Sequence, residues 1–67
     1  MNGTVKTVKR DSGYGFITDD SGVDYFFHVS ALDHALPFEE LAGGERVAFE
    51  PEPSQRGPRA VNIRPAP

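Results

Sequence analysis

Short stretches in which apolar and polar residues alternate make up most of this chain. A two-residue period is typical of β-strands that bury one face. Each stretch is bounded by Gly, Pro, Asp or Ser, which are residues that favour turns. The pattern therefore predicts five strands, over residues 3–9, 14–19, 23–28, 46–50 and 60–64.

The turn-forming residues also predict how the strands are connected. Tight turns at residues 11–13 and 20–22 join the first three strands into an antiparallel meander. Ser30 is expected to cap a single helical turn. Residues 33–44 show no period and are expected to form a long loop, anchored by Leu36, Phe38 and Leu41. Two prolines, Pro51 and Pro53, are expected to end the fourth strand.

Five short strands without a long helix predict an all-β fold, a small antiparallel barrel, because an open sheet of this size leaves unpaired edges. The whole chain, residues 1–67, is expected to be one domain with a frayed tail at about 65–67. The inward strand positions and the loop anchors give the expected core: Val5, Ile17, Phe27, Leu32, Leu41, Val47, Phe49, Val61 and Ile63.

Four rings are predicted to share the outer face of two adjacent strands. A histidine usually takes the wetter face, so His28 carries Phe26 to the surface with it. If Ile17 is buried, Tyr14 and Phe16 point outward as well. Unpaired bases stack on such rings at about 1–3 kcal/mol per base. Burial of the rings in the core is the alternative.

Two glycines flank the first of these rings. Gly13 and Gly15 leave bare backbone beside Tyr14, and we expect this to let a ligand approach closely. A simple turn is the plainer interpretation of Gly13, and the two interpretations are compatible.

Composition excludes several classes of protein. The chain has no Cys and two His, which argues against disulfides and zinc sites. It has no apolar run long enough for a membrane span or a signal peptide, so we expect a cytoplasmic protein. No nucleophile motif surrounds its serines and no glycine-rich phosphate loop is present, so we expect neither an enzyme nor a bound cofactor or metal.

The net charge of −3 argues against a generic nucleic-acid binder, whose footprint is usually basic. The basic residues are nevertheless grouped, with Lys6, Lys9 and Arg10 before the aromatic run and Arg56, Arg59 and Arg64 near the C-terminus. A locally positive groove on an acidic body is one interpretation. Solvated charges without a partner are the other.

Four segments, in order, resemble those of the bacterial cold-shock proteins, and the likeness covers essentially the whole chain. They are Gly3-Thr4-Val5-Lys6, Gly13-Tyr14-Gly15-Phe16-Ile17, Phe26-Phe27-His28-Val29-Ser30-Ala31 and Arg56-Gly57-Pro58-Arg59-Ala60-Val61-Asn62. The resemblance implies a five-stranded OB-fold barrel that binds single-stranded RNA and DNA with weak sequence preference. Members of this family melt unwanted RNA secondary structure and thereby influence transcription and translation. Melting by mass action, through binding of the open strand, requires no ATP.

The resemblance also implies binding residues, at Lys6, Tyr14, Phe16, Phe26, His28, Phe38 and Arg56. Phe38 either reaches the ligand from the long loop or plugs the end of the barrel. We expect a monomer, with a strand-swapped dimer as the alternative.

The chain departs from the family pattern at four positions. Thr7 and Val8 stand where Trp and Phe are typical, Ser12 replaces a usual Lys, and Val29 often has an aromatic counterpart. Each lost aromatic platform costs about 1–3 kcal/mol, which predicts weakened affinity. The alternative function is a cold-shock-like barrel whose nucleic-acid face has decayed and which now serves as a protein-interaction module.

Overall fold

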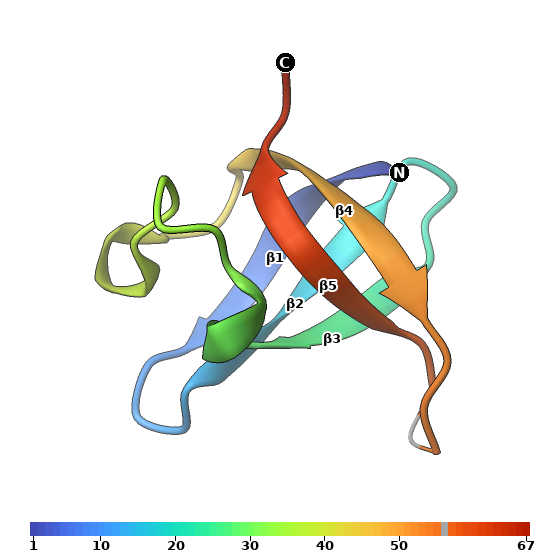
Figure 1. Cartoon of the computed structure of the whole chain (residues 1–67), viewed down its shortest axis with the longest axis horizontal. Coiled ribbons are helices and arrows are strands. Elements are labelled where there is room, and N and C mark those ends of the chain that lie inside the picture. The colour runs from blue at the N-terminus through green and yellow to red at the C-terminus, as the bar shows by residue number, and fades with distance from the viewer. Residues whose placement is uncertain (56) are drawn as a thin grey trace.

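The computed structural model describes residues 1–55 and 57–67. Its strands are β1 (Asn2–Lys9), β2 (Tyr14–Asp19), β3 (Asp24–His28), β4 (Arg46–Glu52) and β5 (Arg59–Pro65) (Figure 1). Two single turns of 3-10 helix, η1 (Val29–Ala31) and η2 (Phe38–Glu40), lie between β3 and β4. The predicted all-β fold and its five strands are confirmed.

The strands close into a barrel in the order β1-β2-β3-β5-β4. Four of the neighbouring pairs are antiparallel, but β3 and β5 are parallel. The prediction of a wholly antiparallel barrel is therefore wrong at this one pair. The reason is geometric, because a closed ring with an odd number of strands cannot alternate in direction all the way round. We call the β3–β5 contact the parallel seam.

The core lies inside the barrel and contains seven of the nine predicted residues. Its buried members are Val5, Ile17, Tyr25, Phe27, Leu41, Val47, Ala48, Phe49, Ala60 and Ile63. The prediction omitted Tyr25, Ala48 and Ala60. It was wrong to include Leu32 and Val61, since Leu32 packs against the core while only partly buried and Val61 is half-exposed.

Val61 faces outward because β5 contains a bulge. Ala48 lies opposite Arg64 while Glu50 lies opposite Val61, so β5 has one residue more than β4 over this stretch. Asn62 within the bulge has a φ of 51°, a conformation in which Asn is enriched among non-glycine residues. The extra residue breaks the alternation, so Ala60 and Ile63 are inward instead of Val61 and Ile63.

Gly15 does not offer its backbone to a ligand, contrary to the expectation from the sequence. A Cβ atom at this position would lie 2.4 Å from the carbonyl oxygen of Thr7 and 2.8 Å from the ring of Phe27. Phe27 fills the space from inside the barrel, and only Gly fits beneath it. At Gly13 the φ of 73° confirms the simple turn.

Two further local predictions are corrected by the structure. β4 continues through Pro51. Phe49 donates its N–H to the carbonyl oxygen of Met1, and Pro51 faces the same side of β4 but lies beyond Asn2, the first residue of β1, so its missing N–H breaks no bond to that strand. The long loop contains η2, and its predicted anchors are confirmed, with Leu41 buried and Leu36 and Phe38 packed against the core.

Phe26 and Phe27 provide a matched test of which face of β3 supports the fold. Phe27 is 0 % exposed and Phe26 is 37 % exposed. We predict that Phe27→Ala lowers the free energy of unfolding by about 3–5 kcal/mol, because it leaves a cavity in a small core. Phe26→Ala removes only contacts among surface rings and should cost about 1 kcal/mol. Urea unfolding of both variants measures the difference, and equal losses would mean that the inward and outward faces are misassigned.

Candidate nucleic-acid interface

The pairing of β2 with β3 places the four predicted rings on one outer surface. Phe16 lies opposite Phe26, and Tyr14 lies opposite His28. Directly opposed residues share a face of the sheet. The intervening residues of both strands are buried, whereas these four rings are half-buried or exposed. The predicted placement of the rings is confirmed.

Tyr14, Phe16 and Phe26 pack against one another, and we call them the ring cluster. The ring centroids of Tyr14 and Phe26 are 5.3 Å apart, and the two ring planes are tilted by 36°. The centroid of Phe16 is 6.0 Å from that of each of the other two rings, in edge-on geometry. The three rings border an open hollow of 560 Å³, which Ser54, Gln55 and Arg59 also line. An apolar hollow with aromatic walls and a polar rim is suited to a flat, uncharged group.

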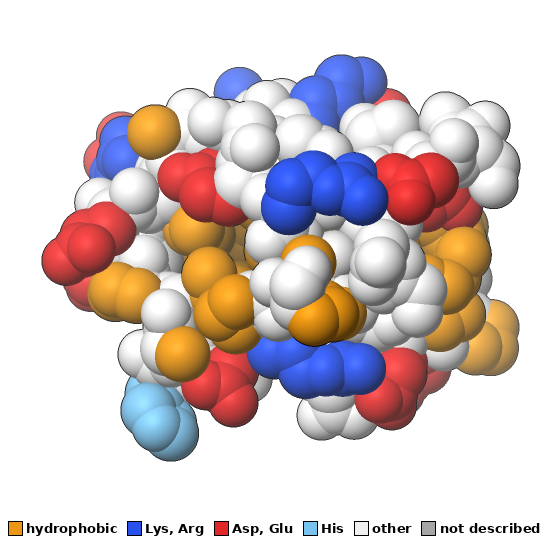
Figure 2. Space-filling model, turned by 90° about the horizontal axis from the view of Figure 1, so that it is seen from above, with side chains coloured by type: hydrophobic (Ala, Val, Ile, Leu, Met, Phe, Trp, Pro, Cys, Tyr) orange, Lys and Arg blue, Asp and Glu red, His pale blue; other side chains and the backbone are white. Residues whose placement is uncertain are grey.

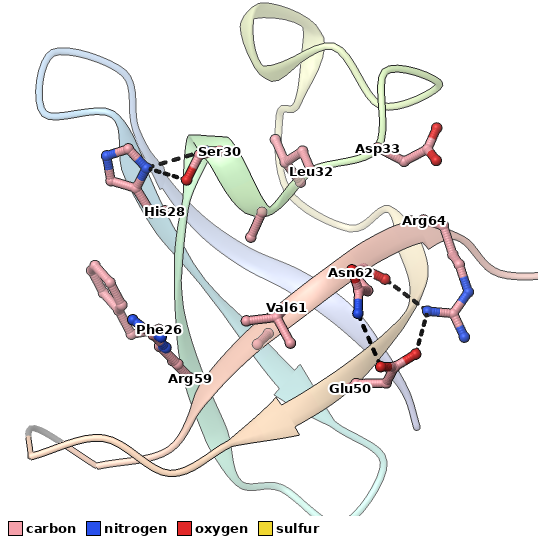
Figure 3. Close-up of a pocket in the computed structure, with 12 residues that line it drawn as sticks. Phe26, His28, Ser30, Leu32, Asp33, Glu50, Arg59, Val61, Asn62 and Arg64 are labelled. Carbon is pink, nitrogen blue, oxygen red and sulfur yellow. Dashed lines mark hydrogen bonds and ion pairs between the residues drawn. The ribbon is translucent and has the colours of Figure 1, made fainter.

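His28 is held by the turn that follows β3. Its Nδ1 accepts a hydrogen bond from the backbone N–H of Ser30 at 3.1 Å and lies 2.9 Å from the Ser30 hydroxyl (Figure 3). His28 thus caps η1, and the expectation that Ser30 would be the cap is wrong. Because Nδ1 accepts, the neutral ring carries its proton on Nε2, and that N–H is the donor it presents to solvent.

A single row of opposed residues crosses four strands at the centre of this surface. Thr7 on β1 lies opposite Phe16, Phe16 lies opposite Phe26, and Phe26 lies opposite Arg59 on β5. Thr7 occupies the position at which the cold-shock pattern has Trp, so the aromatic part of the row ends at Phe16. At the other end Arg59 lines the hollow. No sequence signal singled out Arg59 as a site residue, because only the parallel seam brings it next to Phe26.

A bulge in β1 turns Lys6 toward β3. Val5 lies opposite Ile17 and Thr7 lies opposite Phe16, so Lys6 has no partner of its own on β2. Its Nζ lies 2.8 Å from Oδ2 of Asp24, whose Oδ1 accepts a hydrogen bond from Thr18 at 2.7 Å. The pKa of the Asp24 carboxyl is lowered, first by the hydrogen bond from Lys6 and to a smaller extent by the hydrogen bond from Thr18. A residue predicted to bind phosphate is therefore already paired within the protein.

The other basic side chains near the rings are paired in the same way. Nε of Arg59 lies 2.7 Å from Oε1 of Glu52, and Arg64 lies 3.6 Å from Glu50. Lys9 has no such ion pair within the part of the chain that the structure describes. Figure 2 shows one face on which Lys and Arg side chains lie beside Asp and Glu. The positive groove anticipated from the grouping of basic residues is thus largely neutralised by neighbouring carboxylates.

Two of the predicted site residues are not part of this arrangement. Phe38 is half-buried and packs against the core, as expected if it plugs the barrel, and it does not line the hollow that the ring cluster borders. Arg56 lies outside the residues that the structure describes. The described surface therefore consists of the ring cluster and His28, with Lys6 at its edge.

The chain is similar in sequence to known proteins of one family. The family model of the 'Cold-shock' DNA-binding domain matches residues 1–66. Cold shock protein 1 of Lactiplantibacillus plantarum is 48% identical over 64 residues, 96% of both chains, and a major cold shock protein of Streptococcus pyogenes is 48% identical over 61 residues, 91% of this chain and 90% of that one. The chain belongs to the cold-shock domain family, whose function is nucleic-acid binding.

A solved structure supports the fold independently. The structure described as Drosophila Unr CSD456 superposes with a TM-score of 0.76 at 24% sequence identity, over 98% of this chain and 26% of that one. This likeness confirms the OB-fold barrel. Among the described residues, no helix has the length and hydrophobicity of a membrane span.

The Lys6–Asp24 pair predicts that Asp24→Asn strengthens binding of a single strand. The change frees Lys6 to contact phosphate, and affinity should rise by up to about fivefold at low salt, because a surface ion pair is worth ~0–1 kcal/mol. The dependence of affinity on salt should steepen, since one more cation displaces counterions. Fluorescence titration with a labelled oligonucleotide at several salt concentrations measures both effects.

Asp20→Asn is the matched control for this experiment. It removes one carboxylate from a 2.8 Å pair with Arg46, a residue that does not line the hollow bordered by the ring cluster. If Asp20→Asn strengthened binding as much as Asp24→Asn, the gain in affinity would come from the change in net charge. The ion pair between Asp24 and Lys6 would then have no specific effect on binding.

Proposed function

We propose that this protein binds single-stranded RNA or DNA by stacking bases on the ring cluster, and that it acts as an RNA chaperone or a regulator of transcription and translation. One observation carries the proposal, namely that three adjacent aromatic rings lie outside a barrel whose interior is already filled. These rings add little to the core, and stacking on bases gives them a use.

The proposed path of the strand follows from the neighbours of the ring cluster. Bases lie on Tyr14, Phe16 and Phe26, and the N–H at Nε2 of His28 donates to a base edge or a phosphate oxygen. Lys6, Lys9 and Arg56 are the proposed phosphate contacts. Phe38 joins the interface only if the long loop releases it from the core.

Binding of the open strand also explains how such a protein would melt RNA hairpins. A ligand that binds one of two states shifts the equilibrium toward that state by mass action. No nucleotide hydrolysis is required, and we propose a role without catalysis or a cofactor.

The affinity is proposed to be lower than that of a cold-shock domain with a full aromatic row. Thr7 in place of Trp removes one stacking surface, at about 1–3 kcal/mol. The ion pairs of Lys6 and Arg59 must also be broken or shared before these cations meet phosphate. We propose that the protein works as a monomer in the cytoplasm, where single-stranded RNA is available.

Titration of labelled oligo-dT and oligo-U at two salt concentrations tests the proposal. The label is placed on the oligonucleotide because the chain has no Trp. We expect saturable binding that weakens as salt rises, because phosphate contacts release counterions. Absence of binding at high micromolar concentration, with the protein folded, would contradict the proposal and favour a protein-docking role.

Phe16→Ala tests the ring cluster itself. We predict that it weakens oligo-dT binding by about 1–3 kcal/mol, roughly five- to a hundredfold, while the melting temperature changes little. Val23→Ala is the control, because it shortens another exposed apolar side chain in the turn region between β2 and β3. A large fall in the melting temperature of Phe16→Ala, or an equal loss of binding in Val23→Ala, would show that Phe16 is not a stacking residue.

A further inference from the structure

A second hollow, of 650 Å³, lies beside the ring cluster where β3 and β5 separate (Figure 3). Within the described residues the two strands pair only at Phe26 and Arg59, and the chain that follows η1 meets β5 again at a bridge between Leu32 and Ile63. Between these points β3 leads into η1 while β5 forms its bulge. We call this space the seam hollow; it is bordered by Phe26, Ser30, Leu32, Arg59, Val61 and Asn62, among others. Its volume is typical of a small-molecule site.

The seam hollow is continuous with the ring cluster. Phe26 and Arg59 line both the seam hollow and the hollow over the rings, and His28 borders the seam hollow as well. A strand that stacks on the ring cluster and passes Phe26 therefore reaches the seam hollow directly. Continuity identifies the same strand as the occupant, in preference to a separate small molecule.

The charges of the seam hollow favour an uncharged part of that strand. Two carboxylates, of Asp33 and Glu50, face two guanidinium groups, of Arg59 and Arg64, so there is no excess positive charge for phosphate. Arg64 is held 3.6 Å from Glu50. The apolar side chains of Leu32, Val61 and two alanines provide surface for a flat group. A nucleobase meets both conditions.

Asn62 provides the polar group that can recognise a base edge. Its Nδ2 donates to Oε1 of Glu50 at 3.0 Å, and its backbone carbonyl accepts from Arg64 at 2.7 Å (Figure 3). These contacts hold the amide at the rim of the hollow. Within the described residues the bond to Glu50 is the only one that the side chain makes, which leaves Oδ1 as an acceptor and the second N–H as a donor. An adjacent donor and acceptor match the hydrogen-bonding edge of a base.

We propose that the seam hollow is a subsite for one nucleobase of the strand stacked on the ring cluster, with Asn62 as the residue that reads the edge of that base. The inference rests on the proposed function of the ring cluster and extends it across the parallel seam. It also predicts that this contact adds affinity without adding salt dependence, because a base carries no counterions.

Asn62→Gly tests the role of the amide. Gly accepts the φ of 51° at this position, so the backbone of the bulge is retained. We expect the variant to bind an oligo-dT of about eight nucleotides roughly fivefold more weakly, since one hydrogen-bonding side chain is lost. Binding of about four nucleotides, which covers the ring cluster alone, should be unchanged. The slope of affinity against salt should also stay the same.

Amide chemical shifts of the full chain give a second readout that needs no variant. The longer oligo-dT should shift the signals of Ser30, Leu32, Val61 and Asn62, and the shorter one should shift only those of β2 and β3.

Phe16→Ala separates the two proposals, because it should weaken the binding of both oligonucleotides. If Phe16→Ala weakens binding while Asn62→Gly and the seam amides do not respond, the subsite is overturned and the ring cluster stands. If neither oligonucleotide binds, the ring-cluster proposal itself fails.

Discussion

The closure of five strands into one ring is the constraint on which the rest of this structure depends. With an odd number of strands, one neighbouring pair must run parallel, and here that pair is β3 and β5. The chain satisfies this requirement with a single matched position, Phe26 opposite Arg59. The parallel seam places Arg59 beside Phe26 of the ring cluster, and it leaves the seam hollow open next to them. The proposed binding surface thus lies where the barrel is least completely paired.

The two faces of β3 differ sharply, because one is buried in the core and the other is exposed. Phe26 and Phe27 are adjacent and identical in type, yet Phe26 lies on the outer surface and Phe27 fills the core. Strand alternation alone produces this difference. Because Phe27 fills the interior together with Phe49 and the aliphatic residues, the outer rings are free for another role.

Alternation was enough to predict the strands, most of the core and the outward position of Tyr14, Phe16, Phe26 and His28. It failed wherever the backbone departs from strict alternation. The bulge at Asn62 exposed Val61, and the bulge at Lys6 directed that side chain toward Asp24. A two-residue period carries no information about such insertions, and only the preference of Asn for positive φ signalled one of them.

The electrostatic character of the surface was the least predictable feature. Basic residues that are clustered in sequence suggested a positive groove, but the fold pairs them with acids from other strands. Asp24 on β3 reaches Lys6 on β1 across β2, and Glu52 on β4 pairs with Arg59 on the neighbouring β5. Pairings of this kind depend on strand register, which the grouping of charges along the chain does not reveal. The position of Arg59 beside Phe26 was likewise hidden, because it depends on the topology of closure.

The close contact of Phe27 with Gly15 has a consequence for how the protein responds to temperature. Gly15 lies between Tyr14 and Phe16, so the core ring of Phe27 fixes the backbone from which two of the surface rings project. The interface is therefore pre-organised, and little entropy is lost in ordering it when a strand binds. The same contact makes the interface and the core one cooperative unit. In so small a domain, warming that unfolds the core should disorder the proposed stacking surface at the same temperature, so that loss of binding and loss of the fold coincide.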